Sequence, residues 1–316
     1  MMRCRCKSVC LCINHNRRNL ITSFAGSAFH HHASSWFCSQ VVYILGNHTY
    51  SEKKRKFLRE SSNYRGIALN SSLSKLLEHV ILVNHKEALA TSWMQFGFKA
   101  KSSTTQCTFV LQETIQYYLN NDSRVYCVLL DASQAFDRVQ YVSLFKKMLS
   151  KGLCPVVSRC LLYMHTNQSM SVRWQSVNSN DISISNGVKQ GGILSPVLFS
   201  VYADSLLEKL KTSAVGCHVG SSFNGALAYA DDIVLLAPSR NGLHQMLTTT
   251  EQAGKELNIK FNPSKSQLLV FPAASNCKSP FLFGRELIRA ADSATHLGHH
   301  IGPRQSAAAV KLAAND

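Results

Sequence analysis

The stretch VYCVLLDASQAFD, residues 125–137, decides the fold of this chain. Its first six residues are apolar and partly β-branched, a pattern that predicts a buried β-strand over residues 125–130. The strand ends abruptly at Asp131, so a carboxylate stands at the end of a buried strand. A charged side chain at such a position loses hydration, which indicates that it has a functional partner.

A second acidic site lies in AYADDIVLLA, residues 228–237. The segments 226–229 and 233–237 predict two strands, with Asp231 and Asp232 at the hairpin turn between them. Adjacent carboxylates in an apolar setting repel each other and normally require a cation. Taken alone, the pair also fits an ordinary polar turn, because Asp is favoured there.

Three helices are predicted around these strands. The first covers residues 69–90, the second begins after Ser103 with a capping box to Gln106, and the third has Ser195 as its N-cap and Pro196 as its first helical residue. We expect the apolar stripes of the first two helices to face the core. The stripes of the three helices are Leu73, Leu76, Leu77, Val80, Ile81 and Val83; Cys107, Leu111, Ile115 and Leu119; and Leu198, Tyr202, Leu206 and Leu210.

The composition describes a packed protein with a strongly basic surface. The chain has 34 Lys and Arg residues against 18 Asp and Glu residues, a formal net charge of +16, and 45% hydrophobic residues. This hydrophobic content argues against a disordered basic tail, and the charge favours a polyanionic partner, either nucleic acid or an anionic membrane surface. Since no apolar run reaches the length of about 20 residues that a membrane span needs, we expect no membrane insertion.

Cysteine usage indicates reduced thiols. The eleven cysteines are odd in number and show no framework-like spacing, so we expect no disulfides. Four of them, Cys4, Cys6, Cys10 and Cys12, cluster near His15. Their spacing is not that of a common zinc finger, and an unstructured leader is favoured over a zinc site or a mitochondrial transit peptide.

The chain divides into three predicted parts. Residues 1–60 form a basic, Cys-rich leader without steady periodicity, residues 61–300 form the ordered domain, and residues 301–316 form a short tail. The ordered part alternates strands and helices with carboxylates at strand ends, which predicts an α+β protein.

The acidic residues suit Mg²⁺, which prefers oxygen ligands and shares its remaining positions with water and substrate phosphates. A carboxylate from the Asp131 strand end and one from the Asp231-Asp232 turn fit two ions about 4 Å apart, an arrangement that activates a 3′-hydroxyl and stabilises a leaving pyrophosphate.

An ordered set of motifs resembles the successive motifs of reverse transcriptases, in particular those of non-LTR (LINE-type) retrotransposons. The set covers residues 64–298 and consists of YRGIAL, GFK, LLDASQAFDRV, GVKQGGILSPVLF, AYADDIVLLA, NPSKS and HLG. The resemblance implies a right-hand polymerase with fingers and a palm, the palm being a small antiparallel sheet backed by helices. The tail is too short for a complete helical thumb, so we expect the thumb to be largely missing and synthesis to be poorly processive.

The resemblance also implies roles for single residues. Asp131, Asp231 and Asp232 correspond to the catalytic, Mg²⁺-binding carboxylates, with Asp232 the more peripheral. Phe136 falls on the steric-gate position that excludes the ribose 2′-OH, although a plain core aromatic is the alternative. The remaining positions implied to contact nucleotide, primer or template are Arg65, Gln190, Gly191, Gly192, Tyr229, Ala230 and Lys265; for Arg65 and Lys265, an ordinary surface or structural role stays open.

The sequence therefore predicts an RNA-directed DNA polymerase that uses two Mg²⁺ ions, an RNA template, a DNA primer and a dNTP. The alternatives are a truncated, catalytically inactive retrotransposon remnant that only binds nucleic acid, and a template-independent or DNA-templated nucleotidyltransferase. The sequence leaves open the compartment, nucleus or cytoplasm for an intracellular product, and the oligomeric state.

Overall fold

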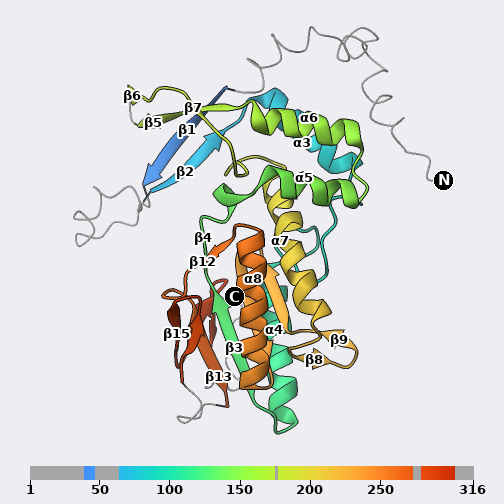
Figure 1. Ribbon diagram of the computed structural model, residues 1–316, viewed down its shortest axis with the longest axis vertical. Coiled ribbons are helices and arrows are strands. Elements are labelled where there is room, and N and C mark those ends of the chain that lie inside the picture. The colour runs from blue at the N-terminus through green and yellow to red at the C-terminus, as the bar shows by residue number, and fades with distance from the viewer. Residues whose placement is uncertain (1–38, 47–63, 175–176, 273–278, 303–316) are drawn as a thin grey trace, which may run out of the picture. The chain divides into compact units, whose positions relative to one another are not determined.

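The computed structural model describes residues 39–46, 64–174, 177–272 and 279–302, and it contains two compact units (Figure 1). Unit 1 comprises Met1–Ala90 and Phe136–Val201, and unit 2 comprises Thr91–Ala135 and Tyr202–Asp316. The Cys4–His15 cluster, most of the predicted leader and the tail from residue 303 lie outside the described residues.

Unit 1 combines a mixed sheet with short helices. Its sheet has the strand order β2-β1-β5-β6, with β7 also paired to β5; β1 is antiparallel to β2 and parallel to β5. The strands are β1 (Ser39–Gly46), β2 (Tyr64–Leu69), β5 (Ser169–Trp174), β6 (Val177–Asn178) and β7 (Ile182–Ser183). The helices are α3 (Ser72–Asn84), η4 (Phe136–Arg138), α5 (Tyr141–Ser150), α6 (Pro155–Thr166) and the first residues of α7 (Ser195–Thr212).

Unit 2 is built on a six-stranded sheet with the order β10-β11-β3-β13-β15-β14. These strands are β3 (Val125–Leu130), β10 (Ala226–Tyr229), β11 (Asp232–Ala237), β13 (Gln267–Phe271), β14 (Phe281–Phe283) and β15 (Glu286–Ala290). The unit also holds α4 (Thr104–Asn120), the later residues of α7, α8 (Arg240–Glu256), and the paired short strands β4 (Ala132–Ser133) with β12 (Lys260–Phe261), β8 (His218–Val219) with β9 (Ser222–Phe223), and β16 (Ala294–His296) with β17 (His299–Ile301).

The central strand β3 is buried on both faces of its sheet, which explains its continuous apolar sequence. Val128 and Leu130 belong to the core cluster that includes side chains from α7 and α8, whereas Cys127 and Leu129 belong to the cluster with α4. Helices therefore cover both faces of this part of the sheet, and only the strand ends can present polar groups.

The strand, the capping box and the third helix predicted from sequence are confirmed. The predicted strand 125–130 is β3. In the N-cap of α4, the Gln106 backbone N–H donates to Ser103 Oγ and the Ser103 N–H donates to Gln106 Oε1, each at 3.1 Å. The stripe of α4 faces the core, as Cys107 and Leu111 are fully buried. The α+β fold class is likewise confirmed.

The first predicted helix, by contrast, was assigned the wrong buried face. Helix α3 is shorter than the predicted span 69–90, because Leu69 belongs to β2 and the helix begins at Ser72 and ends at Asn84. The buried positions of α3 are Ser74, Glu78 and Ile81, whereas Leu76 is 60% exposed. Of the predicted stripe, Leu73, Leu76 and Val83 are exposed, Leu77 and Val80 are half-buried, and Ile81 alone is buried.

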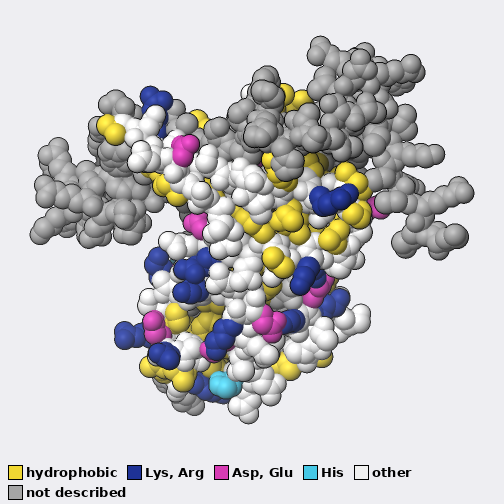
Figure 2. All heavy atoms as spheres, turned by 45° about the horizontal axis from the view of Figure 1, so that its top comes forward, with side chains coloured by type: hydrophobic (Ala, Val, Ile, Leu, Met, Phe, Trp, Pro, Cys, Tyr) yellow, Lys and Arg dark blue, Asp and Glu magenta, His cyan; other side chains and the backbone are white. Residues whose placement is uncertain are grey.

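The physical reason why α3 buries a polar position is a hydrogen-bonded carboxylate. Glu78 accepts from two backbone N–H groups of the loop before α7, so the helix turns a polar position inward. The spacing of hydrophobic residues in the sequence gives no sign of such a hydrogen bond. Several apolar side chains of α3 are therefore exposed at the surface. Hydrophobic side chains also gather on the visible surface of unit 1 (Figure 2).

Cysteines and helix lengths give two further observations on the described residues. Cys107, Cys127, Cys154, Cys160 and Cys217 are free thiols, and all but Cys160 are buried. No helix in this part of the chain combines the length and the hydropathy needed to cross a membrane.

Candidate active site

The sheet of unit 2 brings Asp131 and Asp232 together. Strands β3 and β11 are antiparallel, with Leu130 opposite Ile233. One step further along the same register, Asp131 stands opposite Asp232, and opposed Cα atoms in such a ladder lie about 5 Å apart. Two carboxylates that are far apart in the sequence therefore share one end of the sheet.

The third carboxylate lies in the hairpin that joins β10 to β11. Tyr229 pairs with Asp232, so the turn consists of Ala230 and Asp231. This corrects the predicted hairpin in one detail, since Asp232 is the first residue of β11 and only Asp231 is in the turn. Ala230 adopts a left-handed conformation with φ of 59°, which a two-residue hairpin turn requires.

Electrostatics confirm that the three carboxylates are neighbours. The pKa of Asp232 rises to about 6, first because the side chain is partly buried and then because Asp231 and Asp131 are negatively charged. The charge of Asp232 in turn contributes to a raised pKa of the Cys107 thiol, after the larger effect of that residue's burial. A site with such repulsion binds cations favourably.

The loop after β12 fixes the backbone of Asp131. The Asp131 N–H donates to Ser266 Oγ at 3.2 Å, and the Asp131 carbonyl accepts from the Asn262 N–H at 2.8 Å. Ser266 Oγ itself donates to the Asn262 carbonyl at 2.8 Å. The motif NPSKS thus encloses the peptide of Asp131, and Lys265 is exposed in the same loop.

In unit 1, the motif QGG forms the loop before α7. The Gln190 carbonyl accepts from the Ala68 N–H of β2 at 2.8 Å, and the Gln190 side chain hydrogen-bonds with Asp137. Gly191 is exposed, with φ of 117°. A Cβ atom at Gly192 would lie 2.5 Å from Ser195 Oγ, so no larger residue fits there without displacement.

Glu78 holds this loop from helix α3, and sequence reasoning missed it. Its Oε2 atom accepts from the N–H groups of Ile193 at 2.7 Å and Leu194 at 3.1 Å. Its Oε1 atom accepts from Asn70 Nδ2 at 3.3 Å and Ser74 Oγ at 3.4 Å. These four hydrogen bonds satisfy the carboxylate of Glu78, which is only 6% exposed. The sequence signal that could have identified Glu78 is an acidic residue among the apolar positions of the predicted helix.

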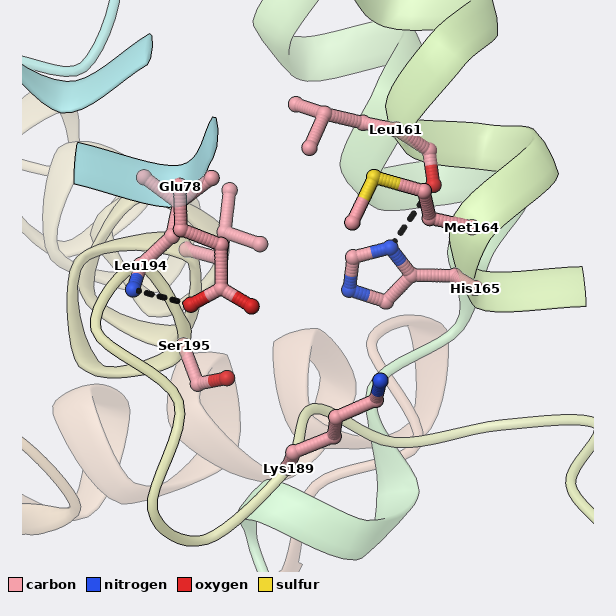
Figure 3. Close-up of a pocket in the computed structure, with 8 residues that line it drawn as sticks. Glu78, Leu161, Met164, His165, Lys189, Leu194 and Ser195 are labelled. Carbon is pink, nitrogen blue, oxygen red and sulfur yellow. Dashed lines mark hydrogen bonds between the residues drawn. The ribbon is translucent and has the colours of Figure 1, made fainter. Parts of the chain in front are cut away.

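A small pocket of unit 1 lies beside Glu78 and contains Lys189 and His165 (Figure 3). His165 Nδ1 lies 2.7 Å from the Leu161 carbonyl, and burial is the main reason why the pKa of His165 falls to about 4. The imidazole is therefore neutral at physiological pH. The lining of this pocket includes Lys189, Leu194 and Ser195 from the loop and the start of α7, and none of the three carboxylates of the sheet end.

Phe136 begins the short helix η4 of unit 1. Its ring is half-buried and stacks on the ring of Phe199, with ring centroids 4.5 Å apart and an interplanar angle of 19°. Phe199 is fully buried in α7. This packing fits both a positioned gate and a core aromatic, so the predicted gate role stays a prediction.

The other predicted contact residues divide between the units. Arg65 lies in β2 of unit 1, opposite Leu45 of β1. Tyr229 ends β10 in unit 2 and is half-buried, with its ring centroid 6.5 Å from that of Phe98. Unit 2 contains Asp131, Asp231 and Asp232. It also contains Tyr229 and Ala230, which directly precede Asp231, and Lys265, whose loop bonds to the backbone of Asp131. The remaining predicted contact residues belong to unit 1: Arg65, Phe136 and Gln190–Gly192.

The three carboxylates fit Mg²⁺ as an ion held jointly with substrate. Among the described residues, no group of three or more His, Cys, Asp or Glu side chains forms a ready-made metal cage. Mg²⁺ is commonly bound by one or two carboxylates plus substrate phosphates, so an open set of this kind suits it. The mutual repulsion at Asp232 supports the same interpretation.

The sequence of the chain matches a known protein family. Residues 52–301 match the model of the family described as reverse transcriptase (RNA-dependent DNA polymerase). The chain belongs to this reverse transcriptase family. The matched span covers most of the chain and includes the three carboxylates and the QGG loop.

Curated relatives of this reverse transcriptase confirm the resemblance to non-LTR retrotransposons. The chain is 28% identical over 212 residues to a Pol polyprotein from the type-1 retrotransposable element R2 of Nasonia vitripennis, which covers 65% of this chain and 20% of that protein. It is 28% identical over 281 residues to the RNA-directed DNA polymerase from mobile element jockey of Drosophila melanogaster, covering 84% of this chain and 29% of the relative. The chain thus spans less than a third of the length of these relatives.

Solved structures show the same fold at low identity. Apo telomerase from Candida tropicalis matches with a TM-score of 0.55 and 10% identity, covering 90% of this chain and 51% of the telomerase chain. Telomerase from the same organism, in complex with a fragment of telomeric RNA, matches with a TM-score of 0.53 and 10% identity, covering 79% of this chain and 44% of the other. These matches support the right-hand polymerase fold.

The raised pKa of Asp232 predicts a specific pH dependence of stability without divalent ions. Because the folded-state pKa of about 6 exceeds the ordinary value of 3.8, the folded state binds the proton more tightly. The free energy of unfolding should therefore fall as the pH rises from about 4 to 6. Asp232→Asn should raise the free energy of unfolding at pH 8 by on the order of 1 kcal/mol, after allowance for solvent screening, because it removes the charge that burial and the neighbouring carboxylates disfavour. At pH 4, where Asp232 is protonated in the folded state, the substitution should leave the free energy of unfolding unchanged.

Urea unfolding at pH 4 and pH 8 in the presence of EDTA measures this difference. The matched control is Asp181→Asn, which removes an exposed carboxylate of unit 1. Its free energy of unfolding should be close to that of wild type at both pH values. An Asp232→Asn effect that is the same at pH 4 and pH 8 would contradict the described electrostatics.

Proposed function

We propose that the chain is the polymerase core of a reverse transcriptase, which extends a DNA primer with deoxynucleotides on an RNA template. The observation that carries this proposal is the gathering of Asp131, Asp231 and Asp232 at one end of a buried sheet. Family membership supplies the reaction class, and the retained carboxylates supply the groups that the reaction needs.

Two Mg²⁺ ions are the proposed cofactors. When bound, such ions lower the pKa of a 3′-hydroxyl and neutralise charge on leaving pyrophosphate. Asp131 and Asp231 are the proposed principal ligands, and Asp232 is the third carboxylate. Ser266 and Asn262 hold the backbone of Asp131, so that its side chain approaches the ions from a fixed position.

The proposed partners are an RNA template, a DNA primer and a dNTP. A net charge of +16 favours a polyanion, and Lys and Arg side chains are spread over the visible surface of unit 2 (Figure 2). One structure with the same fold is described as a telomerase in complex with telomeric RNA. Unit 1 is the proposed fingers part and unit 2 the proposed palm.

Residues of unit 1 have proposed roles in substrate selection. Phe136 is the proposed gate against the ribose 2′-OH, and its stacking on Phe199 supports this role because a gate must be rigid. Gln190, Gly191 and Gly192 are proposed to line the nascent base pair and template. The two glycines have no side chain, so their backbone permits close approach of the nucleic acid. Arg65 is proposed to contact the triphosphate, since a guanidinium suits phosphate oxygens.

Residues of unit 2 have proposed roles at the primer terminus. Tyr229 and Ala230 precede Asp231 and are proposed to lie beside the primer 3′-end. Lys265 is exposed in the loop that fixes Asp131, a position from which it is proposed to donate a proton to pyrophosphate.

Primer extension tests the proposed chemistry directly. On a poly(rA) template with an oligo(dT) primer, Mg²⁺ and dTTP, the chain should incorporate dTMP, and Asp231→Ala should reduce incorporation by at least about a thousand-fold, because an ion-binding carboxylate is lost. The matched control Asp181→Ala, in an exposed segment of unit 1, should retain full incorporation. A folded wild-type chain that binds RNA in a salt-sensitive manner without incorporation would overturn the polymerase in favour of the inactive, nucleic-acid-binding alternative.

Nucleotide discrimination tests the role of Phe136. Phe136→Ala should lower the preference for dTTP over UTP by about ten-fold or more, because the ring no longer meets the 2′-OH. Phe109→Ala, which removes a 58% exposed phenylalanine of α4, is the control and should leave the preference unchanged. The core-aromatic alternative predicts instead that Phe136→Ala destabilises the protein without changing the ratio of the two kcat/KM values.

A further inference from the structure

Gln95 is a fully buried polar residue that none of the motif assignments includes. It lies in unit 2, in the segment that precedes the motif GFK, and its exposed fraction is 0%. A buried amide without partners costs free energy, so its hydrogen bonds show what it does. All of those given by the structure lead to the segment's own backbone or to the hairpin turn between β10 and β11.

The Gln95 side chain pairs with the peptide groups of Ala230. The Ala230 N–H donates to Gln95 Oε1 at 2.9 Å, and Gln95 Nε2 donates to the Ala230 carbonyl at 3.4 Å. Gln95 Oε1 also accepts from the Gly97 N–H at 2.8 Å. One side-chain amide therefore satisfies both backbone polar groups of the residue directly before Asp231.

The backbone around Gln95 is bound to the same hairpin. The Phe96 N–H donates to the Ala228 carbonyl at 2.8 Å, and the Ala228 N–H donates to the Met94 carbonyl at 2.9 Å. Residues 94–96 thus extend the edge of β10 in a parallel direction. This pairing places the Gln95 side chain beside the turn.

The approach is so close that Gly97 has no room for a side chain. A Cβ atom at Gly97 would lie 2.3 Å from the Ala230 nitrogen. Ala230 itself holds φ of 59°, a left-handed conformation that L-residues rarely adopt and that persists only where the surroundings hold it. The bonds from Gln95 are the enforcing contacts that the structure shows at this residue.

We infer that Gln95 is a positioning residue for the catalytic turn: its amide fixes the Ala230 peptide and thereby aims Asp231 at the primer terminus and the metal ions. This inference rests on the proposed function, because it assigns Gln95 a part in the same reaction. Gln95 touches no reacting atom. Its effect is to keep Asp231 in register with Asp131 and Asp232 while the turn is strained.

Gln95→Met is the variant that tests this inference, because it keeps the length of the side chain and removes its hydrogen bonds. Thr250→Val is the matched control: Thr250 is also 0% exposed in unit 2, but its hydroxyl bonds only to the Met246 carbonyl of its own helix. Two measurements are needed, backbone amide exchange by NMR and steady-state primer extension. The first is independent of activity.

In Gln95→Met, amide exchange at Ala230 and Gly97 should accelerate by about ten-fold or more, while exchange in β3 stays unchanged. The kcat of primer extension should fall by about a hundred-fold, with KM for primer–template within about two-fold of wild type, because misplaced catalytic groups lower the rate without weakening binding. Thr250→Val should change neither quantity by more than about two-fold. Faster exchange confined to Ala230 and Gly97, together with a loss of kcat at unchanged KM, would distinguish a positioning role of Gln95 from a general loss of stability.

Three outcomes decide the remaining cases. If Gln95→Met folds with unchanged exchange at Ala230, or with kcat within two-fold of wild type, the inference is overturned. If wild type itself makes no product, the proposed function fails, and the exchange rates alone decide whether Gln95 fixes the turn. If Gln95→Met does not fold, Gln95→Asn replaces it, since its amide is one carbon shorter and should not reach Ala230; exchange at Ala230 should again accelerate by about ten-fold or more, and exchange within about two-fold of wild type overturns the inference.

Discussion

Repulsion among three carboxylates at the end of a buried sheet is the constraint on which the rest of unit 2 depends. Burial first, and then the negative charges of Asp231 and Asp131, raise the pKa of Asp232 to about 6. Hydrogen bonds from neighbouring loops fix the backbone of Asp131 and of Ala230, the residue before Asp231. These hydrogen bonds explain motifs that have no chemistry of their own.

Each carboxylate-bearing segment is held by a loop that is remote in sequence. Ser266 and Asn262 bond both polar groups of the Asp131 peptide, and Gln95 does the same for Ala230. In unit 1, Glu78 holds the loop after Gln190 by two backbone N–H groups. A buried polar side chain bonded to a backbone peptide thus recurs at three places: Ser266 at Asp131, Gln95 at Ala230, and Glu78 at the loop after Gln190.

The sequence predicts well those features that depend on local pattern. The apolar run of β3 and the capping box of α4 are both present as expected, because a buried strand and a helix N-terminus each leave a short, readable signal. The motif order also identifies the family. The hairpin carrying Asp231 was predicted correctly apart from one residue, since strand ends depend on the turn geometry of Ala230.

Features that depend on distant hydrogen bonds were not predictable. Gln95 and Ala230 are 135 residues apart, and Glu78 and Ile193 are 115 apart, so no local pattern connects them. The buried face of α3 was predicted wrongly for this reason, because Glu78 turns inward and Leu76 outward. Roles that need a substrate, such as those of Phe136, Arg65 and Lys265, depend on partners and remain proposals.

The most direct measurement is anomalous diffraction from crystals of the chain grown with an RNA template, a primer ending in a dideoxynucleotide, the next dNTP and Mn²⁺ in place of Mg²⁺. We expect anomalous peaks for two Mn²⁺ ions at the carboxylates of Asp131 and Asp231, adjacent to the triphosphate. Ordered substrates with no peak at these carboxylates, or with a peak held by other residues, would contradict this expectation.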